Sequence, residues 1–248
     1  MKARFIVSLS LLVVCLLVAS DSYSQGASSR RVGQHPHRIK KQAIKTVTGQ
    51  YLLFLPRDYG KSRKQYPLIM YLHGGSLRGD DVEKVRTLGL PQIVEQDKSF
   101  PFIVVSPLCP AGEIWTDTDL LIGILDEVVA KYPVDQSRVY LTGHSMGGRG
   151  AWYLAYKHPE RFAAVAPMSG GPTITAWASK LKDVPVWAFH GAKDDIVPLS
   201  ESEGLVKAIK AAGGDVKLTL LPDRDHFILD MYENKLLYDW FLQHRRNR

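Results

Sequence analysis

The sequence predicts one α/β domain built on a mostly parallel sheet with helices on both faces. Short runs rich in β-branched and aromatic residues alternate with segments of helical periodicity. Several of the short runs are apolar throughout, which is typical of parallel strands buried on both faces. The chain has 248 residues, of which 45% are hydrophobic, and this is enough for one large core.

The expected elements alternate along the chain. One or two opening strands are expected at 46–55, and buried strands at 68–72 and 102–106. A helix at 120–129 precedes a strand at 138–142 and a helix that ends near 158. Further strands are expected at 162–168, 184–189 and 216–221, and helices at 200–212 and 231–244. No internal repeat is evident.

The most informative motif is Gly-His-Ser-Met-Gly at 143–147. It fits the pattern Gly-x-Ser-x-Gly and lies between an expected strand and an expected helix, which is the context of a nucleophile elbow. The glycines allow the strand and the helix to approach each other without a clash at Cβ. The motif therefore predicts that Ser145 is a nucleophile held at the end of the sheet, beside a helix N-terminus.

Two further segments supply the partners that such a serine needs. A serine hydroxyl is a poor nucleophile until a base takes its proton, and a carboxylate orients that base. Asp194 and Asp195 follow the strand expected at 184–189, and His226 follows the strand expected at 216–221. The chain order of serine, acid and histidine and the strand-end positions predict a triad of Ser145, Asp194 and His226.

Four segments, 71–81, 106–110, 143–148 and 190–198, together carry a resemblance to a known superfamily. Through them the chain resembles α/β-hydrolases of the carboxylesterase, dienelactone hydrolase and feruloyl esterase branch, especially secreted members called predicted peptidases or phospholipase/carboxylesterases. The resemblance covers residues from about 45 to 243. It implies that the catalytic acid is Asp194, three residues after the glycine of His-Gly, and that Asp195 is a helix-capping or solvated neighbour.

An oxyanion hole is expected beside the serine. The fold predicts that the backbone N–H of Met146 is one donor and that the loop at 73–76 supplies the other. By resemblance, the second donor is the N–H of Gly75. His73 is expected to brace this loop. His144 is too close to Ser145 along the chain to act as its base, so we expect it to support the site indirectly.

Two tryptophans are candidate substrate-binding residues. Trp115 lies in the loop after the strand at 102–106, and Trp177 lies in a loop or short helix after the strand at 162–168. Both positions lie towards the catalytic edge and would suit a planar or sugar-linked ester, although both residues could also be core. The short connection before 184 leaves no room for a large lid domain. Cys109 is expected to be a small buried residue.

The N-terminus predicts a secretory signal peptide at 1–20. Lys2 and Arg4 precede the apolar run Phe5–Ala19, which is short for a membrane span. An uncleaved anchor is the alternative. A basic arm at 21–45 and a catalytic domain at 46–248 follow. After cleavage Cys109 would be the remaining cysteine, which favours a bacterial protein that is secreted or periplasmic.

The net charge of +7 is concentrated towards the ends of the chain. The arm and the C-terminal Arg245, Arg246 and Arg248 could contact anionic surfaces weakly, although solvated tails are the simpler interpretation. No nucleic-acid motif, metal-ligand spacing or nucleotide-binding loop is present, and His35 and His37 are an isolated pair in the arm. We therefore expect no metal and no cofactor.

Together these features predict a serine hydrolase that cleaves carboxylic esters. Its substrates would be small or polymer-attached esters with short acyl, aromatic or carbohydrate-linked groups. One alternative is a serine peptidase on the same fold, which usually carries a second domain. A second alternative is a surface protein that binds ligands without catalysis, against which the complete set of triad residues argues.

Overall fold

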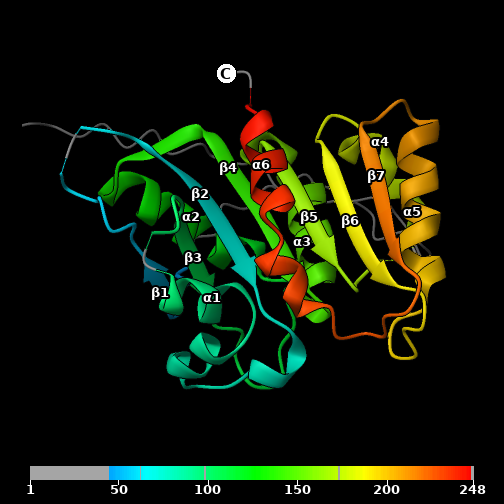
Figure 1. Cartoon of the computed structure of the whole chain (residues 1–248), viewed down its shortest axis with the longest axis horizontal. Coiled ribbons are helices and arrows are strands. Elements are labelled where there is room, and N and C mark those ends of the chain that lie inside the picture. Colours follow the sequence, from blue (N-terminus) through cyan, green and yellow to red (C-terminus); the bar gives the residue numbers. More distant parts are fainter. Residues whose placement is uncertain (1–44, 62, 98, 173, 247–248) are drawn as a thin grey trace, which may run out of the picture. The chain divides into compact units, whose positions relative to one another are not determined.

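Residues 45–246, with the exception of 62, 98 and 173, are described by a computed structural model of the chain. They contain seven strands, which form one sheet in the order β1-β3-β2-β4-β5-β6-β7 (Figure 1). The strands are β1 (Tyr51–Phe54), β2 (Tyr66–Leu72), β3 (Ile103–Pro107), β4 (Val134–His144), β5 (Ala164–Met168), β6 (Val186–Gly191) and β7 (Val216–Leu221). The expected signal peptide, and the expected arm apart from residue 45, lie outside the described residues.

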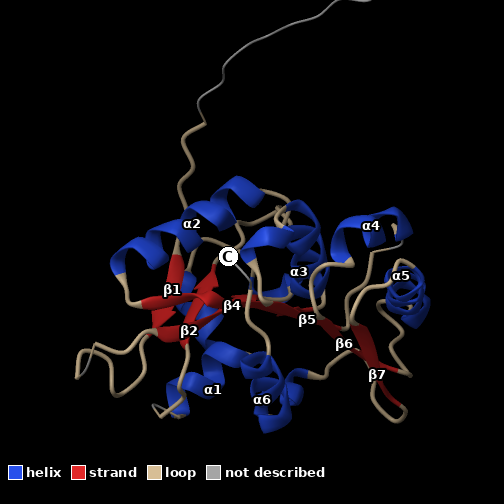
Figure 2. Ribbon diagram, turned by 90° about the horizontal axis from the view of Figure 1, so that it is seen from above, coloured by secondary structure: helices blue, strands red, loops and turns tan. Residues whose placement is uncertain are grey.

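Helices cover both faces of the sheet. Helices α2, α3, α4 and α5 lie on one face, and α1 and α6 lie on the other (Figure 2). Their bounds are α1 (Leu90–Gln96), α2 (Thr118–Lys131), α3 (Met146–Lys157), α4 (Ala178–Leu181), α5 (Leu199–Ala211) and α6 (Lys235–Gln243). Short 3-10 helices are η1 (Gly75–Leu77), η2 (Val82–Thr87), η3 (Pro159–Arg161), η4 (Thr175–Trp177) and η5 (Leu229–Glu233). Among the described residues, no helix has both the length and the apolar character that a membrane crossing requires.

The pairing of the strands confirms the predicted α/β class. Only β1 pairs antiparallel, with β3, and the other neighbouring strands in the described sheet pair parallel. Strand β4 lies between β2 and β5, with Gly143 opposite Leu72 on one side and Pro167 on the other. The nucleophile motif therefore begins in the middle of the sheet, where both neighbours hold the backbone.

The core lies in two layers, one on each face of the sheet. Alternate residues of β2 divide between them: Leu68, Met70 and Leu72 belong to the layer under α2, α3 and α5, and Ile69 and Tyr71 belong to the layer under α1 and α6. All seven residues of β2 are buried, because a central parallel strand is covered on both faces. This rigid sheet carries the loops of the candidate site at its carboxyl edge.

The structure differs from the sequence prediction mainly at element ends and in one missed helix. The helix expected at 231–244 is divided, because the side chain of Asn234 accepts a hydrogen bond from the Leu236 N–H and begins α6 there, after η5. Helix α1 was not predicted. It has only seven residues, with Pro91 in its first turn and Gly89 before it. A short segment with glycine and proline so close together is typical of a turn. The opening segment forms one short strand.

We predict opposite effects on stability for two glycine-to-alanine substitutions. A Cβ at Gly147 would lie 1.8 Å from the Leu72 carbonyl oxygen, whereas a Cβ at Gly204 in α5 would meet no atom within 4 Å. Gly147→Ala should therefore cost more than about 4 kcal/mol of unfolding free energy. Gly204→Ala should add about 0.5–1 kcal/mol, because alanine loses less backbone entropy in a helix. Urea unfolding measures both, and a tolerated Gly147→Ala would contradict the close approach of the two backbones.

Candidate active site

Ser145 lies in the tight turn between β4 and α3. Its backbone has φ 60° and ψ −120°, a conformation that is unfavourable for any residue with a side chain. Among the described residues other than glycine, Ser169 is the second with a positive φ. The N–H of Ser145 donates a hydrogen bond to the Met168 carbonyl at 2.9 Å, which ties the strained turn to the end of β5.

The two glycines of the motif permit a very close approach of backbones. A Cβ at Gly147 would overlap the Leu72 carbonyl, as noted above, and a Cβ at Gly143 would lie 2.4 Å from the Gly147 carbonyl oxygen. Because the obstructing atoms are backbone atoms, no side-chain adjustment could make room. The helix consequently starts directly against the sheet and holds Ser145 up at the carboxyl edge, as the motif predicts.

The structure brings Ser145, His226 and Asp194 together in one hydrogen-bonded chain. The Ser145 Oγ lies 2.7 Å from His226 Nε2, and His226 Nδ1 lies 2.8 Å from Asp194 Oδ2. Since an ionised carboxylate only accepts hydrogen bonds, Nδ1 carries the proton and Nε2 of the neutral ring is free to accept from the serine. His226 is 3% exposed, so this chain is largely shielded from water.

Asp194 is the carboxylate at the end of this chain. Its Oδ1 accepts hydrogen bonds from the backbone N–H groups of Ile196 and Val197 at 3.0 and 2.8 Å. Burial acts to raise the pKa of Asp194, but the hydrogen bonds from Val197, His226 and Ile196 outweigh it, so the pKa is lowered. The carboxylate therefore stays ionised. The neighbouring Asp195 is exposed and is not part of this hydrogen-bonded chain.

His190 is a second histidine beside the carboxylate. Its Nε2 lies 3.0 Å from the Val197 carbonyl and 3.1 Å from Asp194 Oδ2, and its Nδ1 lies 2.8 Å from Ser202 Oγ. The ring is fully buried. It therefore fixes the turn that carries Asp194, a role for which the sequence motif gave no direct signal.

His144 connects the turn at Ser145 to the loop that carries His226. Its Nε2 donates to the carbonyl of His226 at 2.7 Å, and the two rings lie 5.0 Å apart. Burial lowers the pKa of His144 to about 4, so the ring is neutral at neutral pH. The indirect role expected for His144 thus has a specific form, in which one bond holds the backbone of His226 against β4.

The two expected oxyanion donors lie next to Ser145. Met146 is the first residue of α3, where the N–H has no acceptor within the helix. Gly75 begins η1, and a Cβ built on it would lie 3.9 Å from the Met146 Sδ. A Cβ on the adjacent Gly74 would lie 3.7 Å from the Ser145 Cβ. In the described part of the chain, neither N–H has a hydrogen-bond acceptor, so both are available to a ligand.

His73 braces the loop that carries Gly75. Its Nε2 accepts a hydrogen bond from the Cys109 N–H at 3.1 Å, so its Nδ1 carries the proton and donates to the Gly74 carbonyl at 2.7 Å. Burial lowers the pKa of His73 and keeps the ring neutral. The Trp115 indole donates to the His73 carbonyl at 2.9 Å. The loop is therefore fixed from both sides before any substrate arrives.

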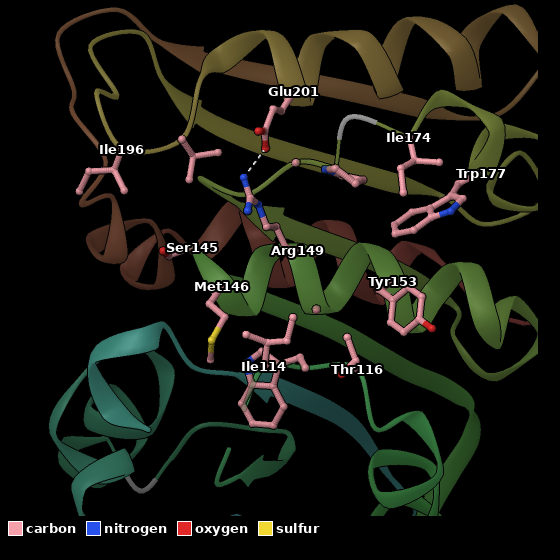
Figure 3. Close-up of a pocket in the computed structure, with 15 residues that line it drawn as sticks. Ile114, Thr116, Ser145, Met146, Arg149, Tyr153, Ile174, Trp177, Ile196 and Glu201 are labelled. Carbon is pink, nitrogen blue, oxygen red and sulfur yellow. Dashed lines mark hydrogen bonds and ion pairs between the residues drawn. The ribbon is translucent and has the colours of Figure 1, made fainter. Parts of the chain in front are cut away.

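A cavity of about 670 Å³ opens beside Ser145 (Figure 3). Both tryptophans expected at the substrate site line it. Trp115 is 5% exposed and also belongs to the core, and Trp177 is partly buried against Tyr156, with ring centroids 4.8 Å apart. The lining residues are Ile114, Trp115, Thr116, Ser145, Met146, Arg149, Gly150, Tyr153, Gly171, Pro172, Ile174, Trp177, Ile196, Val197 and Glu201.

The sequence reasoning missed the polar part of this cavity. Arg149 Nη2 donates to Glu201 Oε2 at 2.7 Å, across the gap between α3 and α5 (Figure 3). Arg149 could have been found from the sequence, because a residue four positions after Ser145 shares its helix face. Glu201 had no such signal, since its position depends on how α5 packs.

The described residues contain no group of three or more histidine, cysteine, aspartate or glutamate side chains placed to hold a metal ion. Cys109 is buried, and burial raises the pKa of its thiol to about 11. It is therefore a poor nucleophile at neutral pH.

Comparison with known proteins agrees with this fold. Residues 114–236 match the Dienelactone hydrolase family. Over 200 residues the chain is 30% identical to "Probable feruloyl esterase C" of Aspergillus terreus, which covers 77% of this chain and 71% of that protein. It is 31% identical over 150 residues to "Bifunctional acetylxylan esterase/xylanase XynS20E" of Neocallimastix patriciarum, of which it spans 21%.

Solved structures show the same fold. A thermostable esterase superimposes with a TM-score of 0.66 at 29% identity, over 79% of this chain and 59% of that chain. A ferulic acid esterase superimposes with a TM-score of 0.60 at 20% identity, over 77% of this chain and 89% of that chain. Fold and site thus define an α/β-hydrolase. The chain belongs to the esterase branch of this superfamily that includes the dienelactone hydrolase family and feruloyl esterases.

We predict that His144 makes the protein sensitive to acid. The folded protein binds a proton at His144 only near pH 4, whereas the unfolded chain binds it near the ordinary value of 6.5. Between these values the unfolded state holds more protons, so stability falls as the pH falls. The loss from this one group should be about 3 kcal/mol between pH 6.5 and 4.

His144→Gln keeps an N–H donor for the His226 carbonyl and removes the titration. Urea unfolding at pH 7 and pH 4 should therefore show a smaller loss of stability for this variant than for the wild type. Equal losses in the two proteins would show that His144 does not control the acid sensitivity.

Proposed function

We propose that the protein is a secreted serine esterase that cleaves carboxylic esters through the triad of Ser145, His226 and Asp194. The proposed substrates carry short acyl groups or aromatic or carbohydrate-linked groups, either as small molecules or attached to a polymer. The observation that carries this proposal is the hydrogen-bonded chain that runs from Ser145 Oγ through His226 to Asp194. The Ser145 end of this chain lines the cavity.

In the first half of the proposed reaction, Ser145 Oγ attacks the ester carbonyl while its proton passes to His226 Nε2. The resulting imidazolium keeps its Nδ1–H bond to Asp194, whose ionised carboxylate stabilises the positive charge. His226 then gives the proton to the alcohol oxygen, the C–O bond breaks, and an acyl-enzyme remains. These proton transfers involve only the substrate and the described residues of the chain.

The negative charge on the tetrahedral oxygen would be stabilised by the N–H groups of Gly75 and Met146. Both are held in place before the reaction, Gly75 by the braced loop and Met146 by the start of α3. A fixed donor of this kind typically contributes about 3–4 kcal/mol to transition-state stabilisation. In the second half, His226 takes a proton from water and the resulting hydroxide attacks the acyl carbon. The bond between the acyl carbon and Ser145 Oγ then breaks, the acid leaves, and His226 returns the proton to Ser145.

Secretion is supported by the sequence at the N-terminus. Lys2 and Arg4 before the apolar run Phe5–Ala19 are typical of a signal peptide, and we propose export to the periplasm or the exterior. The basic residues of 21–45 and the C-terminal arginines are proposed to make weak contacts with anionic surfaces. No nucleic-acid partner and no cofactor are part of the proposal.

We predict that Ser145→Ala abolishes ester hydrolysis. The test compares this variant with the wild type on p-nitrophenyl acetate, butyrate and palmitate, methyl ferulate, acetylated xylan and an aminoacyl p-nitroanilide. Turnover of short-chain or feruloyl esters should fall by a factor on the order of 10⁴ or more. Turnover of the anilide alone would indicate a peptidase, and an inactive wild type that no fluorophosphonate labels would indicate a binding protein.

We predict that Asp194→Asn and Asp195→Asn differ sharply, although the residues are adjacent. Asparagine at 194 can donate to His226 Nδ1 and so favours the tautomer that protonates Nε2, which then cannot accept from Ser145. The kcat should fall by a factor on the order of 10⁴. Asp195→Asn changes an exposed carboxylate outside the chain and should leave kcat within about twofold of the wild type. Equal effects would contradict the choice of acid.

A further inference from the structure

Arg78 joins two backbone carbonyls that lie far apart in the sequence. Its Nε donates to the Gly75 carbonyl and its Nη1 donates to the Glu113 carbonyl, each at 3.1 Å. The first carbonyl belongs to the loop at 73–79, which carries the N–H proposed as an oxyanion donor. The second belongs to the loop at 109–115, which reaches the wall of the cavity. Because a charged donor bonds a carbonyl more strongly than a neutral one does, this side chain can hold the two loops together.

The two peptide groups on either side of the Gly75 Cα are each held by a side chain. The planar peptide group that contains the Gly75 N–H also contains the Gly74 carbonyl. That carbonyl accepts from His73 Nδ1 at 2.7 Å and from the Leu77 N–H at 3.3 Å. On the other side, the Gly75 carbonyl accepts from the side chain of Arg78. Since glycine has no Cβ to restrict its backbone, these bonds determine the direction in which the Gly75 N–H points.

Other bonds between the two loops hold the ends of the first loop, away from Gly75. The Cys109 N–H donates to His73 Nε2, and the Gly79 N–H donates to the Cys109 carbonyl, each at 3.1 Å. Within the described residues, Arg78 is the one whose side chain bonds to the Gly75 carbonyl. Without this side chain, the carbonyl would keep a bond of 3.4 Å from the backbone N–H of residue 78, which is long for a hydrogen bond. The middle of the loop would then be less well fixed than its ends.

The positive charge of Arg78 acts on groups inside this loop. A Cβ on Gly75 would lie 3.9 Å from Arg78 Nε and Nη2, so the guanidinium lies alongside the backbone there. Burial is the main cause of the lowered pKa of His73, and the charge of Arg78 lowers it further. A charge that disfavours a cation at this loop favours an anion near it. Arg78 therefore adds electrostatic support for negative charge on an oxygen bound by the Gly75 N–H.

We infer that Arg78 is a positioning residue of the proposed oxyanion hole, because it fixes the backbone at Gly75 and joins it to the cavity loop at Glu113. Arg78 is not among the residues that line the cavity, so it acts through Gly75 and not on the substrate. The residue after Glu113, Ile114, lines the cavity and is 54% exposed. The bridge thus connects a wall that a substrate would contact to the donor that its oxyanion would need. This inference deepens the proposed esterase function and rests on it.

The experiment separates stabilisation of the oxyanion from binding of the ester. The kcat and KM are measured with p-nitrophenyl butyrate, and the Ki is measured with a phenylalkyl trifluoromethyl ketone. Ser145 Oγ adds to the carbonyl carbon of such a ketone while the serine proton passes to His226, which leaves a negative oxygen in the place of the oxyanion. The ketone therefore reports on the hole, whereas KM responds to a loss of ester binding.

Arg78→Met keeps an unbranched side chain and removes every donor. Loss of a whole oxyanion donor lowers kcat by about 10²–10³-fold, and a donor that remains but is less well oriented should cost a part of this. The kcat should therefore fall on the order of 10-fold, the Ki should rise by the same factor, and KM should stay within about twofold of the wild type.

Two further variants isolate the bridge. Arg78→Lys keeps the charge, but an ammonium lacks the fixed fork that reaches both carbonyls, so kcat should recover only in part, to within about threefold of the wild type. Full recovery would show that the charge alone suffices and would overturn the bridge. Arg86→Met is the matched control, because Arg86 also forms side-chain bonds, to Glu83 and Glu95, but lies outside the cavity and its loops. Its kcat and Ki should match those of the wild type.

The outcomes separate this inference from the esterase proposal. If the wild type hydrolyses esters through Ser145 while Arg78→Met leaves kcat and Ki unchanged, the inference is wrong and the esterase function stands. The inference is also wrong if KM rises at unchanged kcat, or if only the unfolding free energy in urea falls, as a purely structural role predicts. A wild type that hydrolyses no ester and is not labelled by a fluorophosphonate would instead refute the esterase proposal. Complete final labelling of each variant shows that its triad is folded.

Discussion

The close approach of α3 to β2 is the constraint on which the rest of the site depends. Because no atom beyond hydrogen fits on Gly147, the helix can begin against the Leu72 carbonyl, and Ser145 is forced into its unfavourable backbone conformation. The hydrogen bond from the Ser145 N–H to the Met168 carbonyl, at the end of β5, stabilises this unfavourable conformation. The same approach places Met146 at the start of α3, where its N–H has no acceptor among the described residues, so one backbone contact positions both Ser145 and this N–H group.

The buried histidines around this turn have different tasks because they face different acceptors. His73 and His144 donate to backbone carbonyls, and burial lowers the pKa of each, so they hold loops in place and take no part in proton transfer. His226 faces an ionised carboxylate on one side and a hydroxyl on the other. It is thus the ring of these three for which a positive charge would be compensated. Their roles follow from their hydrogen-bond partners rather than from their closeness to Ser145.

The sequence predicted those parts of the molecule that depend on local patterns. The buried strands were found because β2 and its neighbours are apolar throughout, and the strand at 216–221 has the bounds that its alternation indicated. The residues of the hydrogen-bonded chain could be named because each follows a strand end, and such ends meet at one edge of a parallel sheet. Helix α1 escaped prediction because seven residues that begin with a proline turn carry little periodicity. The role of Glu201 could not be predicted, because it depends on the packing of α5 against η4 and α3.

The residues proposed to carry out the reaction can be recognised from local sequence motifs. The residues that line the cavity, and so influence which substrate binds, come together only through long-range packing. The groups proposed to carry out the reaction lie in motifs at strand ends, whereas the cavity walls come from α3, from the loops around Trp115, Pro172 and Val197, and from single residues of η4 and α5. These segments meet only in the folded chain. Since Ser145 immediately precedes α3 and Arg149 lies in its first turn, the helical rise sets the distance between Ser145 and the pair of Arg149 and Glu201. A substitution on this face of the helix would therefore change the lining of the cavity without moving Ser145. For this reason the family identifies the reaction class, while the substrate must be inferred from the side chains that line the cavity.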